Sequence, residues 1–292
     1  MKKKLLAIIG MACVLCLSAV LLAGCSGGGS TESTAESTAE EESTASSVEA
    51  TTDDSADITD FIVGFDQSYP PYGFVGDDGE YTGFDLDLAK AVCEKNGWNL
   101  QLEAIDWDAK DAFIESGAIT CIWNGFTMEG REDNYTFSEP YMLNGQVVVV
   151  PAGSDINSLE DLAGKTVVTQ VDSAALDVLE GDQADLAATF ASLDTIADYN
   201  TAFVMLQSGQ VDAVACDLSI AEYNMAANPD AYRQLDETLS DEHYAVGFLK
   251  GNDALAQKVS ETLKELNDDG TVEELCDKYA EYGISYDNWL IK

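Results

Sequence analysis

Residues 61–104 read FIVGFDQSYPPYGFVGDDGEYTGFDLDLAKAVCEKNGWNLQLEA, and their pattern decides the fold class. The apolar run at residues 61–65 predicts a buried strand. Residues 85–96 have apolar side chains at helical spacing, and Gly97 is typical of the position after a helix. Residues 100–104 predict a second strand. A strand, a helix and another strand in this order are typical of an α/β protein.

The same alternation continues to the C-terminus. Further strands are predicted at residues 119–123, 146–150, 166–170, 211–215 and 244–249. Further helices are predicted at residues 108–116, 158–161, 173–179, 200–208, 253–267 and 272–282. This alternation predicts parallel sheets with helices on both faces, and a length of 292 residues suggests about two domains.

The first residues have the pattern of a secretion signal. Three lysines precede a long uncharged apolar stretch, and residues 22–25 read LAGC. These four residues resemble a bacterial lipobox, which implies that residues 1–24 are a lipoprotein signal peptide and that Cys25 becomes lipidated, with palmitate among the lipids. The alternative is an uncleaved signal anchor. Both place the rest of the chain outside the cytoplasm and tether it to the membrane.

Residues 25–57 follow the signal with a biased composition. After Cys25 they are Ser, Thr, Gly, Ala, Glu and Asp, with Val48 as the one exception. Such a segment has almost no apolar area to bury, so we expect a disordered acidic tether. A glycosylated stalk is compatible with the same composition.

The charge balance excludes several classes of function. The chain has 54 acidic and 14 basic residues, for a net charge of −40, whereas a nucleic-acid-binding protein needs a basic surface. His243 is the only histidine, so catalytic triads and multi-histidine metal sites have little to build on. No phosphate-binding glycine motif is present. We therefore expect no catalytic residues, no metal site and no cofactor.

Four cysteines remain beyond the signal and Cys25. They have no CxxC or metal-ligand spacing, and two of them lie in apolar strand-like runs. Buried free thiols are the simplest interpretation, and the sequence leaves a disulfide open. The four are Cys93, Cys121, Cys216 and Cys276.

Several short motifs occur in a fixed order beyond residue 58. They are FDQSYPPY (65–72), GFDLDLA (83–89), WNGFTMEGR (123–131), FSEPY (137–141), LEDLAGK (159–165), SGQVDA (208–213) and DGT (269–271). Together they resemble the family 3 extracellular solute-binding proteins, the substrate-binding lipoproteins of amino-acid ABC importers. The resemblance covers residues 58–292. It implies a type II periplasmic-binding-protein fold, in which two α/β lobes joined by two crossing strands close over a ligand. By this resemblance lobe 1 spans residues 58–143 plus 245–292, and lobe 2 spans residues 144–244.

The resemblance also implies which residues bind a zwitterionic amino acid. Arg131 is expected to bind the carboxylate, because its planar guanidinium can form two parallel hydrogen bonds. Asp217 matches the acid that binds the ammonium, together with the carbonyl of Gly125. The hydroxyl of Thr127 and the backbone near Ser173 are expected to assist at the carboxylate.

The side-chain end of the ligand is expected to meet aromatic rings. Tyr69 and Trp107 occupy positions where the family places large apolar groups, and Asp66 matches an acid at the edge of the pocket. Two further acids depart from the family's pattern near the proposed site. These are Glu129 and Asp172, and the sequence leaves open whether they line the pocket.

The resulting hypothesis is capture of an L-amino acid outside the cytoplasm and its delivery to an ABC permease driven by a cytoplasmic ATPase. The protein is expected to be a monomer and not an enzyme. One alternative is a lipoprotein that senses a ligand without transport. Another is an enzyme on the same fold, similar to a dehydratase. The acidic charge weakly favours polar neutral or basic amino acids, and the aromatic positions allow larger ligands such as cystine.

Overall fold

The computed structural model describes residues 58–292, which belong to a single compact unit of the chain. The proposed signal peptide, the proposed tether and Cys25 lie outside the described residues. Within residues 58–292, no helix is both long and apolar enough to cross a membrane.

The first five-stranded sheet has the strand order β5-β1-β6-β13-β7. Its strands are β1 (Asp60–Phe65), β5 (Asn99–Ala104), β6 (Cys121–Ile122), β7 (Tyr135–Phe137) and β13 (Gly247–Leu249). The helices packed around it are α1 (Phe84–Asn96), α2 (Lys110–Glu115), α7 (Asp253–Asp268) and α8 (Thr271–Lys278). We call this sheet and its helices lobe 1.

The second five-stranded sheet has the order β10-β9-β11-β8-β12. Its strands are β8 (Met142–Pro151), β9 (Thr166–Gln170), β10 (Ser192–Ile196), β11 (Ala213–Asp217) and β12 (Tyr232–Tyr244). Its helices are α3 (Ala174–Glu180), α4 (Ala184–Ala187), α5 (Tyr199–Ser208) and α6 (Leu218–Ala227). We call this sheet and its helices lobe 2.

Short elements complete the fold. A small sheet in lobe 1 consists of β2 (Ser68–Tyr69), β3 (Gly73–Val75) and β4 (Tyr81–Thr82). Single turns of 3-10 helix occur at Trp107–Ala109, Leu159–Leu162, Ala280–Tyr282 and Tyr286–Asn288. The turn after Ser158 begins with the capping box that its sequence predicts, since Ser158 and Asp161 bond each other's backbone.

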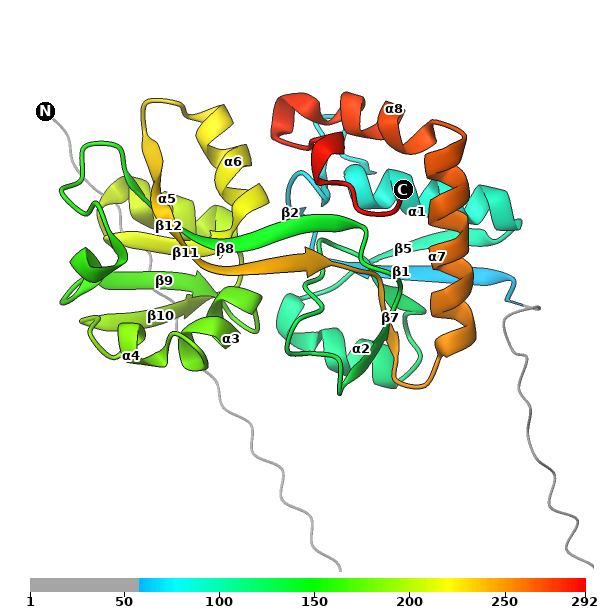
Figure 1. Cartoon of the computed structure of the whole chain (residues 1–292), viewed down its shortest axis with the longest axis horizontal. Coiled ribbons are helices and arrows are strands. Elements are labelled where there is room, and N and C mark those ends of the chain that lie inside the picture. Colours follow the sequence, from blue (N-terminus) through cyan, green and yellow to red (C-terminus); the bar gives the residue numbers. More distant parts are fainter. Residues whose placement is uncertain (1–57) are drawn as a thin grey trace, which may run out of the picture. The chain divides into compact units, whose positions relative to one another are not determined.

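Two long strands carry the chain between the lobes (Figure 1). β8 follows β7 of lobe 1, and β12 leads back to β13 of lobe 1. The two strands pair in antiparallel fashion from Met142↔Tyr244 to Pro151↔Tyr232. Lobe 1 is therefore built from two segments that are distant in the sequence, whereas lobe 2 is one continuous segment.

The prediction of parallel sheets is wrong in part, because both sheets are mixed. β1 pairs in parallel with β5 and β6, as the opening βαβ pattern predicts. However, β13 runs antiparallel to β6 and β7, and β8 runs antiparallel to β11 and β12. The strand that enters each lobe from the other lobe, β8 in lobe 2 and β13 in lobe 1, runs opposite to its neighbours β11 and β6.

The core of each lobe lies between its sheet and its helices. Phe61, Val63 and Phe65 occupy alternate positions along β1, are fully buried and belong to one hydrophobic cluster with residues of α1 and α7. The four cysteines are free and buried, so the simplest interpretation of the cysteines is confirmed. Trp123 is fully buried at the end of β6 and is a core residue.

Candidate functional site

A small cavity between the lobes is lined by most of the residues that the sequence singled out. Its walls come from the loops after β1 and β6 of lobe 1 and from β9, α3 and β11 of lobe 2. The lining residues are Tyr69, Trp107, Gly125, Thr127, Arg131, Gln170, Ser173, Ala174 and Asp217. Its volume of about 20 Å³ has room for about one water molecule, so the lobes stand closed upon each other.

Arg131 supplies the positive charge of the cavity. Its guanidinium is buried and lies over the ring of Phe126, 5.0 Å from the ring centre. It donates hydrogen bonds to the carbonyl of Thr127 at 3.4 Å and to the carbonyl of Asp172 at 3.3 Å. Its closest partner is the carboxylate of Asp177 on α3, at 2.8 Å. A planar cation held in this way can bind a carboxylate, and a carboxylate of lobe 2 already contacts it.

Asp217 supplies a negative charge to the same cavity. It is the last residue of β11 and the residue before α6, and only 5% of its surface is exposed. Its Oδ1 accepts hydrogen bonds from Asn144 Nδ2 at 2.9 Å and from Gln146 Nε2 at 2.7 Å. Within residues 58–292 it forms no ion pair. A buried carboxylate without a cation is costly, and a ligand ammonium would compensate it.

Gly125 has a backbone conformation that favours glycine. Its φ is 56°, and an added Cβ would lie 3.0 Å from the ring of Tyr244. Its N–H donates to Asp85 Oδ2 at 2.6 Å. The hydroxyl of Tyr141 also donates to Asp85, at 2.7 and 2.9 Å. Burial raises the pKa of Asp85 to about 7. Asp85 therefore fixes the loop of Gly125 from behind, a role that the sequence analysis missed.

The hydroxyl of Thr127 donates its hydrogen bond to a protein side chain and not to the expected ligand carboxylate. Its Oγ1 donates to Glu242 Oε2 at 2.9 Å, so it offers only lone pairs to the cavity. Glu242 lies on β12 and is 3% exposed. The sequence analysis missed Glu242, because β12 is polar and has no clear apolar alternation.

The two predicted aromatic residues both border the cavity. Tyr69 is buried, and its hydroxyl lies 3.2 Å from the hydroxyl of Tyr244. Trp107 packs edge-on against Phe126 and donates from Nε1 to the carbonyl of Asp172 at 3.1 Å. Trp107 thus belongs to the core of lobe 1 and also touches lobe 2.

Ser173 caps the helix that faces Arg131. Its hydroxyl accepts from the N–H of Leu176 at 3.2 Å, and it lies 3.1 Å from the hydroxyl of Thr169. Ala174 follows it as the first residue of α3. Ser173 and the first residue of this helix therefore line the cavity.

Asp66 lies beside the cavity rather than in its wall. It is 8% exposed and accepts a hydrogen bond from Gln170 Nε2 of lobe 2 at 2.8 Å. Burial raises the pKa of Asp66, and the charges of Asp198 and Asp106 act in the same direction. Asp66, Asp106, Asp108 and Asp198 all line a neighbouring cavity of about 300 Å³, which shares Trp107 with the first one. Its lining favours a cationic group.

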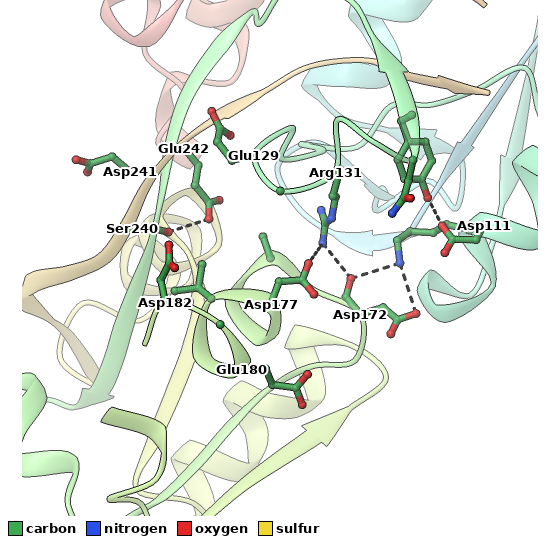
Figure 2. A pocket seen from close by; sticks show the side chains of 17 residues that line it. Asp111, Glu129, Arg131, Asp172, Asp177, Glu180, Asp182, Ser240, Asp241 and Glu242 are labelled. Carbon is green, nitrogen blue, oxygen red and sulfur yellow. Dashed lines mark hydrogen bonds and ion pairs between the residues drawn. The ribbon is translucent and has the colours of Figure 1, made fainter. Parts of the chain in front are cut away.

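The backbone carbonyl of Asp172 is one point where lobe 1 contacts lobe 2. It accepts hydrogen bonds from Trp107, Arg131 and Lys110, the last at 3.4 Å, and the carboxylate of Asp172 lies 3.5 Å from Lys110 Nζ (Figure 2). Asp172 has a φ of 53°, a left-handed backbone conformation that residues other than glycine rarely adopt. Burial lowers the pKa of Lys110, and the nearby charge of Arg131 adds to the effect.

A wide acidic groove opens beside Arg131. Its volume is about 740 Å³, and it lies between the loop after β6, α3 and β12 (Figure 2). Glu129 and Asp172 line this groove and not the small cavity. Glu129 is held by β12, because its Oε1 lies 2.6 Å from His243 Nδ1 and its Oε2 accepts from the N–H of His243 at 3.0 Å. No cluster of metal-ligating side chains occurs within residues 58–292.

Known proteins resemble this chain in both sequence and structure. The L-cystine-binding protein TcyJ of Escherichia coli (strain K12) is 28% identical over 221 residues, which are 75% of this chain and 81% of TcyJ. The ABC transporter glutamine-binding protein GlnH of Bacillus subtilis (strain 168) is 30% identical over 69% of this chain and 73% of its own. A crystal structure of an ABC uptake transporter substrate-binding protein from Streptococcus pneumoniae with bound histidine has a TM-score of 0.74 at 32% identity. It covers 78% of this chain and 95% of that one.

A structure of an ancestral arginine-binding protein bound to arginine also matches, with a TM-score of 0.70 at 34% identity over 76% of this chain and 98% of that one. The family model of the bacterial extracellular solute-binding proteins, family 3, matches residues 61–282. The two lobes joined by β8 and β12 are accordingly those of a type II periplasmic-binding protein. The chain belongs to the bacterial extracellular solute-binding proteins of family 3.

Proposed function

We propose that this protein captures an L-amino acid between its lobes outside the cytoplasm and delivers it to the permease of an ABC importer. The observation that carries the proposal is one cavity that holds both Arg131 and Asp217. The guanidinium would bind the ligand carboxylate, and Asp217 with the Gly125 carbonyl would bind the ammonium. The relatives named above, which bind cystine, glutamine, histidine or arginine, support the same class of ligand.

The small volume of the cavity indicates that ligand binding requires the lobes to open. A volume of about 20 Å³ cannot hold an amino acid, so the lobes have to part before a ligand can enter. The ligand would then meet Arg131 on lobe 1 and Asp217 on lobe 2. Contacts to both lobes exist only in the closed form, so binding shifts the population toward closure.

The side chain of the ligand would point past Trp107 toward Asp66. The neighbouring cavity of about 300 Å³ is lined by four carboxylates and contains no lysine or arginine among its lining residues. Asp66 is the buried member of the four, and a desolvated carboxylate favours a cationic partner. We therefore expect basic amino acids to bind more tightly than acidic ones.

The organisation of the whole chain belongs to the same proposal. Residues 1–24 would be removed as a signal peptide, Cys25 would carry the lipid anchor, and residues 25–57 would tether a monomeric binding unit to the membrane. Lobe 1 would span residues 58–143 plus 245–292, and lobe 2 residues 144–244. The assignment of strands to the two sheets supports these boundaries.

A thermal-shift screen of residues 58–292 tests the proposed function. The screen uses the twenty L-amino acids, ornithine and cystine on protein freed of ligand. A ligand at a hundred times its Kd stabilises the native state by about 2.7 kcal/mol, which raises the melting temperature by roughly 5–11 °C. We expect the largest shifts from basic amino acids. A folded sample that responds to none of these compounds would contradict the proposed function.

The variant Arg131→Ala tests the proposed carboxylate contact. Removing one member of a desolvated charge pair costs about 2–5 kcal/mol, so we expect affinity to fall roughly 30-fold to several thousand-fold by calorimetry. Arg233→Ala is the matched control, because Arg233 is the only other arginine and bonds the carbonyl of Ser154 and the side chain of Asn157. Equal affinities of the two variants would remove Arg131 from the site.

A further inference from the structure

Two carboxyl groups converge on the ammonium end of the site. Asp217 faces the small cavity, and Glu242 lies behind it on β12. Both accept hydrogen bonds from the same two amides of β8. Gln146 Nε2 lies 2.7 Å from Asp217 Oδ1 and 2.8 Å from Glu242 Oε2. Asn144 Nδ2 lies 2.9 Å from Asp217 Oδ1 and 3.4 Å from Glu242 Oε2. The two acids are therefore close neighbours with shared donors.

No cation compensates this pair. Within residues 58–292, neither carboxylate forms an ion pair with lysine, arginine or histidine, and the two are 5% and 3% exposed. Two adjacent buried carboxylates cannot both be ionised cheaply, so one proton is shared by such a pair when no cation is present. Burial and the charge of Asp217 both raise the pKa of Glu242.

The hydrogen bonds indicate where that proton lies. Glu242 Oε2 accepts from Gln146 and Thr127, and amide nitrogens can only donate. Glu242 Oε1 has a single partner, the hydroxyl of Ser240 at 2.8 Å, and a hydroxyl can also accept. A proton on Oε1 therefore keeps every other hydrogen bond of the pair unchanged.

The other charged groups near Glu242 do not replace a ligand cation. Most of these groups line the wide groove that Glu242 also lines (Figure 2). The acids among them oppose ionisation of Glu242. Asp217 faces it from β11, and the other titratable or charged groups around it are Glu129, Arg131, Asp177, Asp182, Asp241 and His243. Arg131 and His243 are each engaged by another carboxylate, Asp177 and Glu129 respectively.

We propose that Glu242 is the second acid of the ammonium site and that it exchanges its proton for the ligand's ammonium. In the ligand-free protein Glu242 is the neutral acid. When the ammonium binds at Asp217, its positive charge favours ionisation of Glu242. The O–H bond at Oε1 breaks, the electron pair stays on the carboxylate, and the proton leaves to solvent. The exit is open, because Glu242 lines the wide groove whereas Asp217 lines the closed cavity.

The inference rests on the proposed function and predicts a linkage to pH. Binding that releases protons becomes tighter as pH rises, by up to about tenfold per pH unit, until Glu242 is already ionised in the free protein. Thr127 connects the two sites, because its hydroxyl bonds Glu242 while its lone pairs face the cavity. Glu242 is thus a positioning residue that sets the charge of the ammonium site.

Calorimetric proton counting tests the exchange. L-Arginine is titrated into residues 58–292 in buffers of different ionisation enthalpy between about pH 5 and pH 7, below the pKa of its amino group. If another amino acid gives a larger shift in the screen, the probe is the one with the largest shift among those whose side chain does not titrate in this range. We expect release of up to one proton per ligand at the pH where release is greatest, and an affinity that rises with pH over the same range.

Two variants assign the proton. Glu242→Gln keeps the shape of the side chain and should bind with pH-independent affinity and no proton release. Asp241→Asn removes the same charge from an exposed neighbour on β12 but keeps the Glu242 carboxyl, so it should still release a proton on binding. A purely structural role of Glu242 would weaken binding without changing the proton count. Binding by the wild type without proton release, or equal release from Glu242→Gln, would overturn the inference. Absence of any binding would instead contradict the proposed function.

Discussion

At the scale of single residues, the buried Asp85 links the stability of the fold to the geometry of the site. Asp85 is fully buried, and its carboxylate holds the N–H of Gly125 and the hydroxyl of Tyr141 without a cation in hydrogen-bond contact. Burial of this ionisable group lowers the free energy of unfolding when the group is charged. In return, the Asp85 carboxyl positions the loop between β6 and Arg131. The same loop presents Gly125 and Thr127 to the cavity.

We expect the Asp85 carboxyl to make the wild type less stable as pH rises. Its pKa in the folded protein is about 7, above the usual value near 4 of an exposed Asp, so the native state binds the proton more tightly than the unfolded state. This contribution to the unfolding free energy is complete below about pH 4 and is lost as pH rises to about 7, by roughly 1–4 kcal/mol.

Urea unfolding of the wild type and Asp85→Asn at about pH 5 and pH 8 measures this loss. The amide can still accept from Gly125 and can donate to Tyr141, so the variant should lack this part of the pH dependence. Asp230→Asn is the control, because Asp230 is exposed. Parallel pH profiles for the wild type and Asp85→Asn would show that Asp85 does not carry the effect.

At the scale of elements, helix α3 competes with a ligand for Arg131. Its residue Asp177 lies 2.8 Å from the guanidinium and is largely exposed. A ligand carboxylate has to displace this contact. Exposed ion pairs are worth about 0.2–1 kcal/mol, so the competition is modest.

We therefore expect Asp177→Asn to bind its amino acid roughly 1.5- to 5-fold more tightly than the wild type in calorimetry. Glu180→Gln is the matched control, since Glu180 lies on the same helix, lines the same groove and has no contact with Arg131. An equal gain in both variants would indicate a general charge effect, and unchanged affinity of Asp177→Asn would contradict competition.

At the scale of the whole molecule, a few contacts hold the lobes together without a ligand. Lys110 of lobe 1 binds both the carbonyl and the carboxylate of Asp172 in lobe 2. On other sides of the cavity, Gln170 binds Asp66, and Asn200 Nδ2 donates to the carbonyl of Ser68 at 3.2 Å. Water can replace these polar contacts when the lobes part. Aromatic rings also meet across the lobes, Tyr69 with Tyr199 and Tyr223 with Tyr282.

We expect Lys110→Met to raise the open fraction of the ligand-free protein by up to about tenfold, because one partly buried interlobe ion pair is lost. Small-angle X-ray scattering should then show a larger radius of gyration without ligand, and addition of the bound amino acid should restore the compact value. Lys95→Met is the control, because Lys95 pairs with Asp269 and Glu265 within lobe 1. Scattering identical to the wild type in both states would contradict the role of Lys110.

Much of the fold follows from local pattern in the sequence. The strand at residues 166–170 and the ends of α1 and α5 at glycines with positive φ agree closely with prediction. These features depend on neighbouring residues alone, because caps and apolar periodicity act within one or two turns. The motif around Arg131 and the one before Asp217 also marked the two charged residues that now line one cavity.

Other features depend on contacts between distant segments. β12 reads YRQLDETLSDEHY, which has no strand-like alternation, and it becomes a strand because it pairs along β8. The burial of Glu242, the contact of Asp85 with Gly125 and the convergence of lobe 1 donors on Asp172 all follow from such pairing. The sequence by itself determined the order of strands and helices and the charges offered to a ligand. Only the tertiary structure decided which carboxyl groups lose their water and share donors, because burial is a property of the packed lobes and not of the local sequence.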